Sequence, residues 1–164
     1  MSNFDVKKQE AYDFKLLQKL NEDVFHLNDL ERRIDNTDKD PIDASGMTTD
    51  GKTINIEIKS RDDLYPSMMC ETHKAYSLLD EWATYKRVPL YVNFLNNGND
   101  ALVWNLLTIP PNMKYMKIER TFSDLYKVWE NQYKVYFDLK AAKHYVINNE
   151  GKYVKKGATR GSLP

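Results

Sequence analysis

An α/β fold with a single mixed central β-sheet flanked by helices is predicted by three features of this 164-residue chain. Hydrophobic residues recur at helical spacing near the N-terminus, alternate with polar residues in the middle, and return to helical spacing further on. This length suits one compact domain, which we place at residues 1–157, with a flexible tail at 158–164.

The first helix is expected over residues 5–21. Val6, Phe14 and Leu17 lie on one stripe at about 100° per residue, as on an amphipathic helix. Glu10 falls inside that stripe, and a buried carboxylate is costly without a partner. A glutamate at the edge of a stripe can equally extend to water.

A β-hairpin is expected next, because Ile54, Ile56 and Ile58 alternate with polar residues at the period of a strand. The run Thr49-Asp50-Gly51 suits a three-residue turn with glycine in the left-handed position. The residue numbers of each cross-strand pair then sum to 100, which places Asp43 opposite Glu57.

The remaining elements follow from the same periodicities. We expect a helix over 68–86, strands at 89–95 and 101–109, a helix starting at Thr121, and short strands near 133–139, 143–147 and 152–155. Tyr76 is expected on the inner face of the second helix, and Phe122, Leu125, Tyr126 and Trp129 on that of the third. Most tyrosines and tryptophans fall on such inner faces, so we assign them to core packing rather than to base stacking.

Composition excludes several classes of protein. The formal net charge is zero, which argues against a polybasic histone-like binder. One cysteine, Cys70, excludes a disulfide framework and multi-cysteine zinc sites and suits a reducing compartment. The start MSNFDVKKQE does not resemble a signal peptide, and no apolar run reaches about 18 residues. We expect no membrane association and a cytoplasmic location, in a bacterial or phage-infected host cell.

Charge is nevertheless divided along the chain. Residues 1–63 carry 15 acids and 10 bases, whereas residues 64–164 carry 9 acids and 14 bases. Most of the basic excess comes late, at Lys140, Lys143, Lys152, Lys155, Lys156 and Arg160. This segment is either a solvated basic end or a surface for phosphates.

Asp43, Glu57 and Lys59 form the constellation that indicates chemistry. Opposed residues of an antiparallel pair have Cβ atoms about 4.5–5.5 Å apart, and two carboxylates that close repel unless a cation or a proton intervenes. Mg²⁺ suits one or two carboxylates, and Mn²⁺ is the other candidate. Lys59, on the same face as Glu57, is placed to act on a water molecule or a phosphate. The alternative is a strand with an ordinary solvated face.

The run Pro41-Ile42-Asp43, followed after 14 residues by Glu57-Ile58-Lys59, resembles the signature of the PD-(D/E)XK nuclease superfamily. The expected order of elements also resembles the restriction-endonuclease-like core of that superfamily over residues 5–109. One departure is that Ile42 stands between the proline and the acid. Asp40 is therefore a rival first ligand, although its parity places it on the opposite face from Glu57.

The resemblance implies metal ligands at Asp43 and Glu57, a catalytic lysine at Lys59, and a further acid at Glu10 directed at the metal. It also implies a polar or basic residue near the site, for which Lys74 is the candidate. Ser60 and His73 are weaker candidates, and His73 fits a surface or packing role.

Nucleic-acid contacts are expected from two groups of basic residues. Arg61 continues the face of Glu57 and Lys59 and is placed to contact a phosphate, and Lys74 is a further candidate for contact with nucleic acid. Backbone contacts are expected from Lys152, Lys155 and Lys156, or from Lys114, Lys117 and Arg120.

The expected function is a Mg²⁺-dependent endonuclease that hydrolyses DNA, structure-selective for branched DNA such as a Holliday junction, and a homodimer by resemblance. The alternative is a catalytically inactive nuclease-like fold that acts as a nucleic-acid-binding or assembly module.

Overall fold

The computed structural model describes residues 3–33, 42–123 and 126–157. Its helices are α1 (Asn3–Leu20), which a π-helical turn extends to Phe25, and α2 (Thr72–Tyr85). The strands are β1 (Asn28–Arg32), β2 (Ala44–Met47), β3 (Thr53–Ser60), β4 (Ser67–Glu71), β5 (Val88–Leu95), β6 (Asp100–Asn105), β7 (Lys114–Ser123), β8 (Val128–Asp138), β9 (Lys143–Ile147) and β10 (Tyr153–Lys155). The expected helix at the N-terminus, the hairpin and the strands near 89–95, 143–147 and 152–155 are all present.

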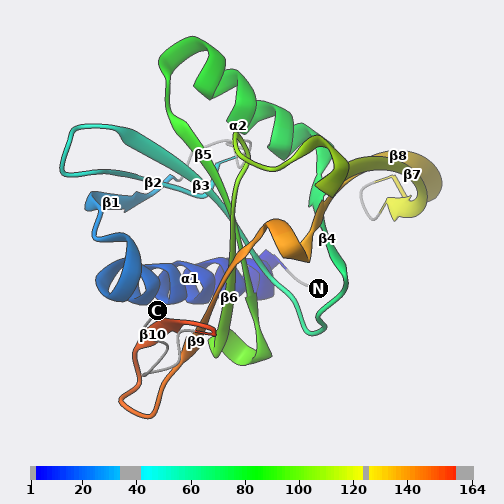
Figure 1. Ribbon diagram of the computed structural model, residues 1–164. Coiled ribbons are helices and arrows are strands. Elements are labelled where there is room, and N and C mark those ends of the chain that lie inside the picture. Colours follow the sequence, from blue (N-terminus) through cyan, green and yellow to red (C-terminus); the bar gives the residue numbers. More distant parts are fainter. Residues whose placement is uncertain (1–2, 34–41, 124–125, 158–164) are drawn as a thin grey trace.

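The main sheet has seven strands in the order β1-β2-β3-β5-β6-β9-β10. It is mixed, because β3 and β5 are parallel whereas the other neighbours are antiparallel. The expected α/β fold with one mixed central sheet is confirmed (Figure 1).

The two helices cover opposite faces of this sheet. Leu17 and Leu20 of α1 pack with Ile56 and its aliphatic neighbours on β3. Ala75 and Leu78 of α2 pack in a second cluster on the other face. Because side chains alternate along a strand, Asn55, Glu57 and Lys59 project to the side of α2.

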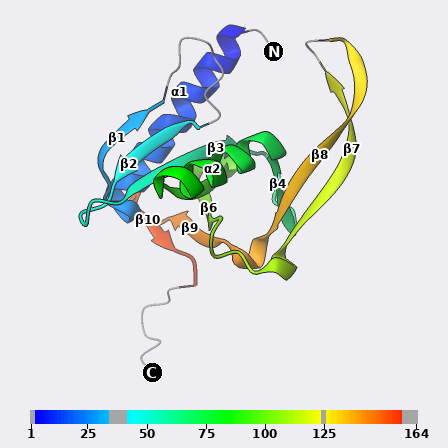
Figure 2. The ribbon, with the colours of Figure 1, turned by 90° about the horizontal axis from the view of Figure 1, so that it is seen from above.

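A second sheet of three strands, in the order β4-β8-β7, was not predicted. Figure 2 shows β7 and β8 as a long hairpin beside the main body, extending on the same side of the molecule as the N-terminal end of α1. β1 was not predicted either.

The expected helix over 68–86 begins four residues late. Met68 and Cys70 are buried and pair with β8, so residues Ser67–Glu71 form a strand and the helix starts at Thr72. The inner stripe of the helix is therefore rotated: Tyr76, expected inside, is exposed.

The helix expected to begin at Thr121 is wrong. Phe122 and Trp129, seven residues apart, suit two helical turns, but they are cross-strand partners of β7 and β8 in edge-to-face contact, with ring centroids 5.6 Å apart. Their exposure also overturns the assignment of these aromatic residues to the core. Asp124 and Leu125 lie outside the described residues.

Candidate functional site: opposed carboxylates beneath α2

The hairpin of β2 and β3 sets the position of the two carboxylates. Every cross-strand pair from Ala44–Ile56 to Met47–Thr53 has residue numbers that sum to 100, as predicted. Gly51 has a φ of +83°, the left-handed conformation that a turn of this type requires. One residue beyond the ladder, the Asp43 carboxylate Oδ2 accepts a hydrogen bond of 2.7 Å from the Ile58 N–H. This contact holds Asp43 across from Glu57.

Glu57 is the most deeply buried charged residue of the described chain, because its side chain is only 2% exposed. Its Oε1 accepts a hydrogen bond from the Lys74 ammonium group on α2. Burial and the Asp43 charge raise the pKa of Glu57 well above 4.5, despite the opposing effect of Lys74. Burial lowers the pKa of Lys74, but Glu57 and Asp43 raise it by more, so this lysine is charged at neutral pH.

Buried polar groups without hydrogen-bond partners gather around Glu57. In the described part of the chain, the buried side-chain atoms that lack a partner are Asn55 Oδ1, Glu57 Oε2, Arg61 Nε and both polar atoms of Asn93. All four residues belong to β3, to the position just after it, or to the adjoining strand β5. Such atoms are rare in folded proteins, so their concentration marks a place built to receive water, an ion or a ligand.

Lys59 lies on the same face as Glu57, one pair further along β3, and its side chain is exposed. Asn93 on β5 is its neighbour in the parallel register. Lys59 is therefore placed beside the buried carboxylates with its ammonium group accessible from solvent.

Lys74 and Arg61, both expected to contact nucleic acid, make contacts within the protein. Lys74 points inward to Glu57. The Arg61 Nη2 donates to the Met69 carbonyl at 2.8 Å, which fixes the guanidinium against β4. Both cations border the carboxylate site.

Glu10 is not brought into contact with Asp43 or Glu57. It is exposed on α1, where its Oε2 accepts a hydrogen bond of 2.8 Å from Arg32 on β1. The buried acid on this helix is Asp13, whose Oδ1 accepts from the Ser60 hydroxyl at 2.6 Å. Asp40, the rival first ligand, lies outside the described residues.

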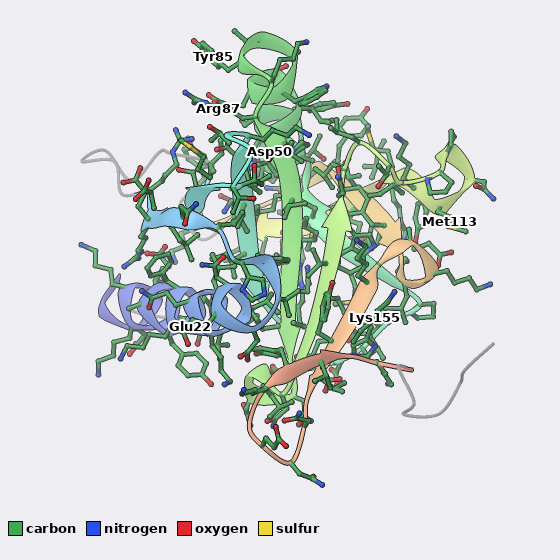
Figure 3. All side chains as sticks on the ribbon, turned by 60° about the vertical axis from the view of Figure 1, so that its left-hand side comes forward. Glu22, Asp50, Tyr85, Arg87, Met113 and Lys155 are labelled. Atoms are coloured by element: carbon green, nitrogen blue, oxygen red, sulfur yellow. The ribbon has the colours of Figure 1, made fainter. Side chains whose placement is uncertain are left out.

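The basic residues Lys152, Lys155 and Lys156 are exposed, as expected. β10 forms the edge of the main sheet, with β5, β6 and β9 between it and β3. Figure 3 shows Lys155 on that strand, far from Tyr85 and Arg87 at the end of α2. These lysines do not join the carboxylate site.

A shallow groove of about 400 Å³ adjoins the carboxylates on the side of β1 and β2. It is lined by Asp29, Glu31, Arg33, Ser45, Gly46, Met47, Thr53, Asn55 and Arg87. Ser45 and Asn55 are cross-strand partners that lie two residues from Asp43 and Glu57 along their strands. The groove therefore offers mixed polar contacts next to the site.

The donor set suits a hard divalent cation better than a softer metal. Asp43 and Glu57 provide carboxylate oxygens, and Glu57 Oε2 is buried without a partner. Among residues 3–33, 42–123 and 126–157, no group of three or more His, Cys, Asp and Glu residues is arranged to hold a metal. Two carboxylates with several waters are still a normal environment for Mg²⁺.

Asn93 is the residue that the sequence reasoning missed, and Lys74 is a residue that only the resemblance placed near the site. Asn93 is the one polar residue inside the apolar run Leu90–Leu95 apart from the Tyr91 hydroxyl, and this isolation was the available signal. Lys74 could not be placed, because its direction depends on where α2 begins.

A central mixed sheet with an Asp, Glu and Lys constellation on one face thus defines this protein. No family model matches the chain, and no curated protein matches it. Among solved structures, it is similar to Hjc, a Holliday junction resolvase from the archaeal hyperthermophile Archaeoglobus fulgidus. The TM-score is 0.49 with 15% identity, over 81% of this chain and 86% of that chain. At this level of identity, the similarity concerns the fold alone.

In the part of the chain that the structure describes, neither helix has the length and apolar character needed to cross a membrane.

Proposed function

We propose that this protein is a divalent-metal-dependent nuclease that hydrolyses DNA phosphodiester bonds at Asp43, Glu57 and Lys59. The observation that carries this proposal is the cluster of unpartnered buried polar atoms on the face of β3 and β5 that holds these residues. A buried carboxylate beside a second carboxylate is costly unless a cation joins them.

Asp43 and Glu57 would hold the cation, through oxygen donors of the kind that Mg²⁺ or Mn²⁺ prefers. When bound, the cation would supply Lewis-acid polarisation of the phosphate and a lowered pKa for water. The raised pKa of Glu57 supports this assignment, because a nearby positive charge would restore its ionised form.

The chain's own cations have separate roles in this proposal. Lys59, accessible from solvent, orients or deprotonates the attacking water or stabilises charge on the phosphate. Lys74 positions the Glu57 carboxylate through its ion pair. Arg61, fixed on the Met69 carbonyl, holds the border of the site.

Branched DNA is the substrate class we propose, and a homodimer is the proposed assembly. Both extend the resemblance of the Asp43, Glu57 and Lys59 motif to the PD-(D/E)XK nuclease superfamily, whose compact members often act as dimers.

One observation favours a second function, a nuclease-like fold that binds nucleic acid without cleaving it. Lys74 already compensates Glu57, so the carboxylate has a cation in the absence of any metal. A binding module would need no divalent ion.

The test is cleavage of a panel of linear, flapped and four-way DNAs, with Mg²⁺ and with EDTA. Asp43→Ala, Glu57→Ala and Lys59→Ala should each reduce the cleavage rate by at least about 100-fold. The first two variants lose a ligand of the cation, and the third loses a group of the acid–base type, which contributes about 10²–10⁴-fold. Asp50→Ala is the matched control, since Asp50 is an exposed carboxylate on the turn of the same hairpin.

Full activity of Glu57→Ala would exclude the site. Thermal unfolding with and without Mg²⁺ separates the two functions, because a ligand that binds the folded state raises the melting temperature. If the protein is a nuclease, Mg²⁺ should raise the melting temperature of the wild type but not that of Glu57→Gln. If it is a binding module, Mg²⁺ should change neither melting temperature.

A further inference from the structure

The hairpin of β7 and β8 has two chemically different faces. The register pairs Phe122 with Trp129 and Ile118 with Tyr133, so even positions of β7 share a face with odd positions of β8. The outer part of this face, which we call the aromatic face, consists of Met116, Ile118, Arg120, Phe122, Trp129, Asn131 and Tyr133.

Carboxylates are confined to the opposite face. The acids of the two strands are Glu119, Glu130 and Asp138, at odd positions of β7 or even positions of β8. Among the described residues of the two strands, the aromatic face therefore combines large apolar rings with a cation, Arg120, and carries no carboxylate.

The aromatic face is uncovered by the rest of the described chain. Trp129 is 61% exposed, Tyr133 58%, Ile118 54% and Met116 49%. β4 pairs only with the inner half of β8, residues 134–138, so the outer half extends beyond it. With aromatic side chains of about 150–250 Å² each, the exposed area is on the order of 500 Å², the size of patch that usually serves binding.

We propose that the aromatic face binds unpaired bases of a nucleic acid, with Trp129, Phe122 and Tyr133 stacking on the bases and Arg120 contacting the phosphates. The Arg120 guanidinium lies 5.8 Å from the centre of the Trp129 ring. An aromatic platform beside a cation is the usual arrangement for single-stranded nucleic acid, because every base has a stackable face and every nucleotide a negative charge.

Charge favours this occupant over a second copy of the chain. A two-fold contact between two aromatic faces would bring the Arg120 side chains of the two copies together without a carboxylate on either face to compensate them. A phosphate backbone supplies that compensation directly.

The aromatic face is also continuous with the carboxylate site. Phe137, on the same face of β8, packs edge-on against Tyr91 with ring centroids 5.8 Å apart, and Tyr91 is the register partner of Glu57. Figure 2 shows the hairpin leaving the body next to β4, which follows the end of β3. As part of the proposed nuclease, the hairpin would hold an unpaired strand of a branched substrate.

Binding is measured in EDTA, so that no cleavage is required, with a fluorescein-labelled single strand of mixed sequence and with the matching duplex. Trp129→Ala should weaken single-strand binding by roughly 5- to 150-fold, the usual effect of removing a stacking residue, and Trp129→Phe should retain most of the affinity. The matched control is Tyr85→Ala, because Tyr85 is exposed on α2 with Arg87 4.8 Å from its ring (Figure 3).

Unchanged single-strand affinity of Trp129→Ala, or an equal loss for duplex, would overturn the proposal. So would a wild-type dimer in sedimentation that Trp129→Ala converts to a monomer, since the face would then belong to a second copy. The inference depends on the proposed nuclease function only where it states that the hairpin holds an unpaired strand of a branched substrate. A protein that binds through Trp129 but cleaves nothing with Mg²⁺ refutes the nuclease and keeps the stacking face.

Discussion

Glu57 is surrounded at short range by one like charge and one opposite charge. Asp43 and burial disfavour its ionised form, whereas Lys74 favours it, and the net effect is a raised pKa. Without a divalent cation, the folded protein therefore binds a proton at Glu57 more tightly than the unfolded chain does. The free energy of unfolding consequently falls as the pH rises from about 4.5 through the raised pKa of Glu57.

Glu57→Gln should raise the melting temperature in EDTA, because it removes a charge that burial and Asp43 oppose while its amide oxygen still accepts from Lys74. The gain should be a few degrees at pH 7–8, at about 2–4 °C for each kcal/mol, and should vanish near pH 4.5. Thermal unfolding monitored by circular dichroism across this pH range measures it.

Lys74→Met is the control for this measurement. It leaves the Glu57 carboxylate buried with no cation, and breaking such a pair from one side costs about 3–5 kcal/mol. A wild type clearly more stable than Glu57→Gln in EDTA at pH 7–8 would mean that the two carboxylates do not face each other.

The sequence predicted the register that opposes Asp43 and Glu57 better than it predicted the contacts around them. Asp43 and Glu57 could be placed opposite each other because a three-residue turn with a left-handed glycine determines the register of the whole hairpin. Lys74 could not be placed, because its direction depends on tertiary contacts: Met68 and Cys70 pair with β8, a strand more than 55 residues away. Once α2 starts at Thr72, Lys74 lies one turn from the buried Leu78 and faces the sheet.

For the secondary-structure elements, the sequence pattern predicted the structure correctly where the contacts are local. The hairpin of β2 and β3 needed only alternation and a turn. β7 and β8 were missed in part because Phe122 and Trp129 are seven residues apart, which fits a helix as well as a cross-strand pair. The alternation of Tyr133, Val135 and Phe137 along β8 was the better signal, since a helix would scatter those residues around its axis.

Two glycines allow the packing of α1 on the sheet to be measured. Gly98, in the turn between β5 and β6, and Gly51, in the turn between β2 and β3, have nearly the same φ, +82° and +83°. A Cβ at Gly51 would meet nothing within 4 Å, whereas a Cβ at Gly98 would lie 2.5 Å from Cδ2 of Leu16 on α1.

Gly51→Ala should lower the free energy of unfolding by about 1–2 kcal/mol, the cost of a left-handed conformation for a residue with a side chain. Gly98→Ala should cost about 1–3 kcal/mol more, because Leu16 must move within a packed cluster. Urea unfolding of both variants gives the difference. Equal losses would show that α1 does not press on this turn.

In the whole molecule, the acidic and basic parts of the chain lie at separate places on the main sheet. The carboxylate site lies on β2 and β3, and the exposed lysines of β10 occupy the opposite edge of the same sheet. Four strand spacings separate β3 from β10, roughly 19 Å at about 4.8 Å each. That separation is similar to the width of a duplex, so a DNA bound at the carboxylates is within reach of the basic edge.

Replacing Lys152, Lys155 and Lys156 with Ala should therefore weaken DNA binding to a similar extent for every sequence. For every phosphate that the variant no longer neutralises, the slope of log affinity against log salt concentration should become shallower by about 0.9 on duplex DNA. Cleavage at saturating substrate should be unchanged, because the carboxylates are on other strands. The control is Lys52→Ala with Lys86→Ala, two exposed lysines on the turn of the β2–β3 hairpin and at the end of α2, whose removal should leave the slope close to that of the wild type. Binding isotherms at several salt concentrations distinguish the two outcomes. If the triple variant has the wild-type slope, the basic edge is a solvated surface, and the DNA is confined to the side of the sheet that carries Asp43 and Glu57.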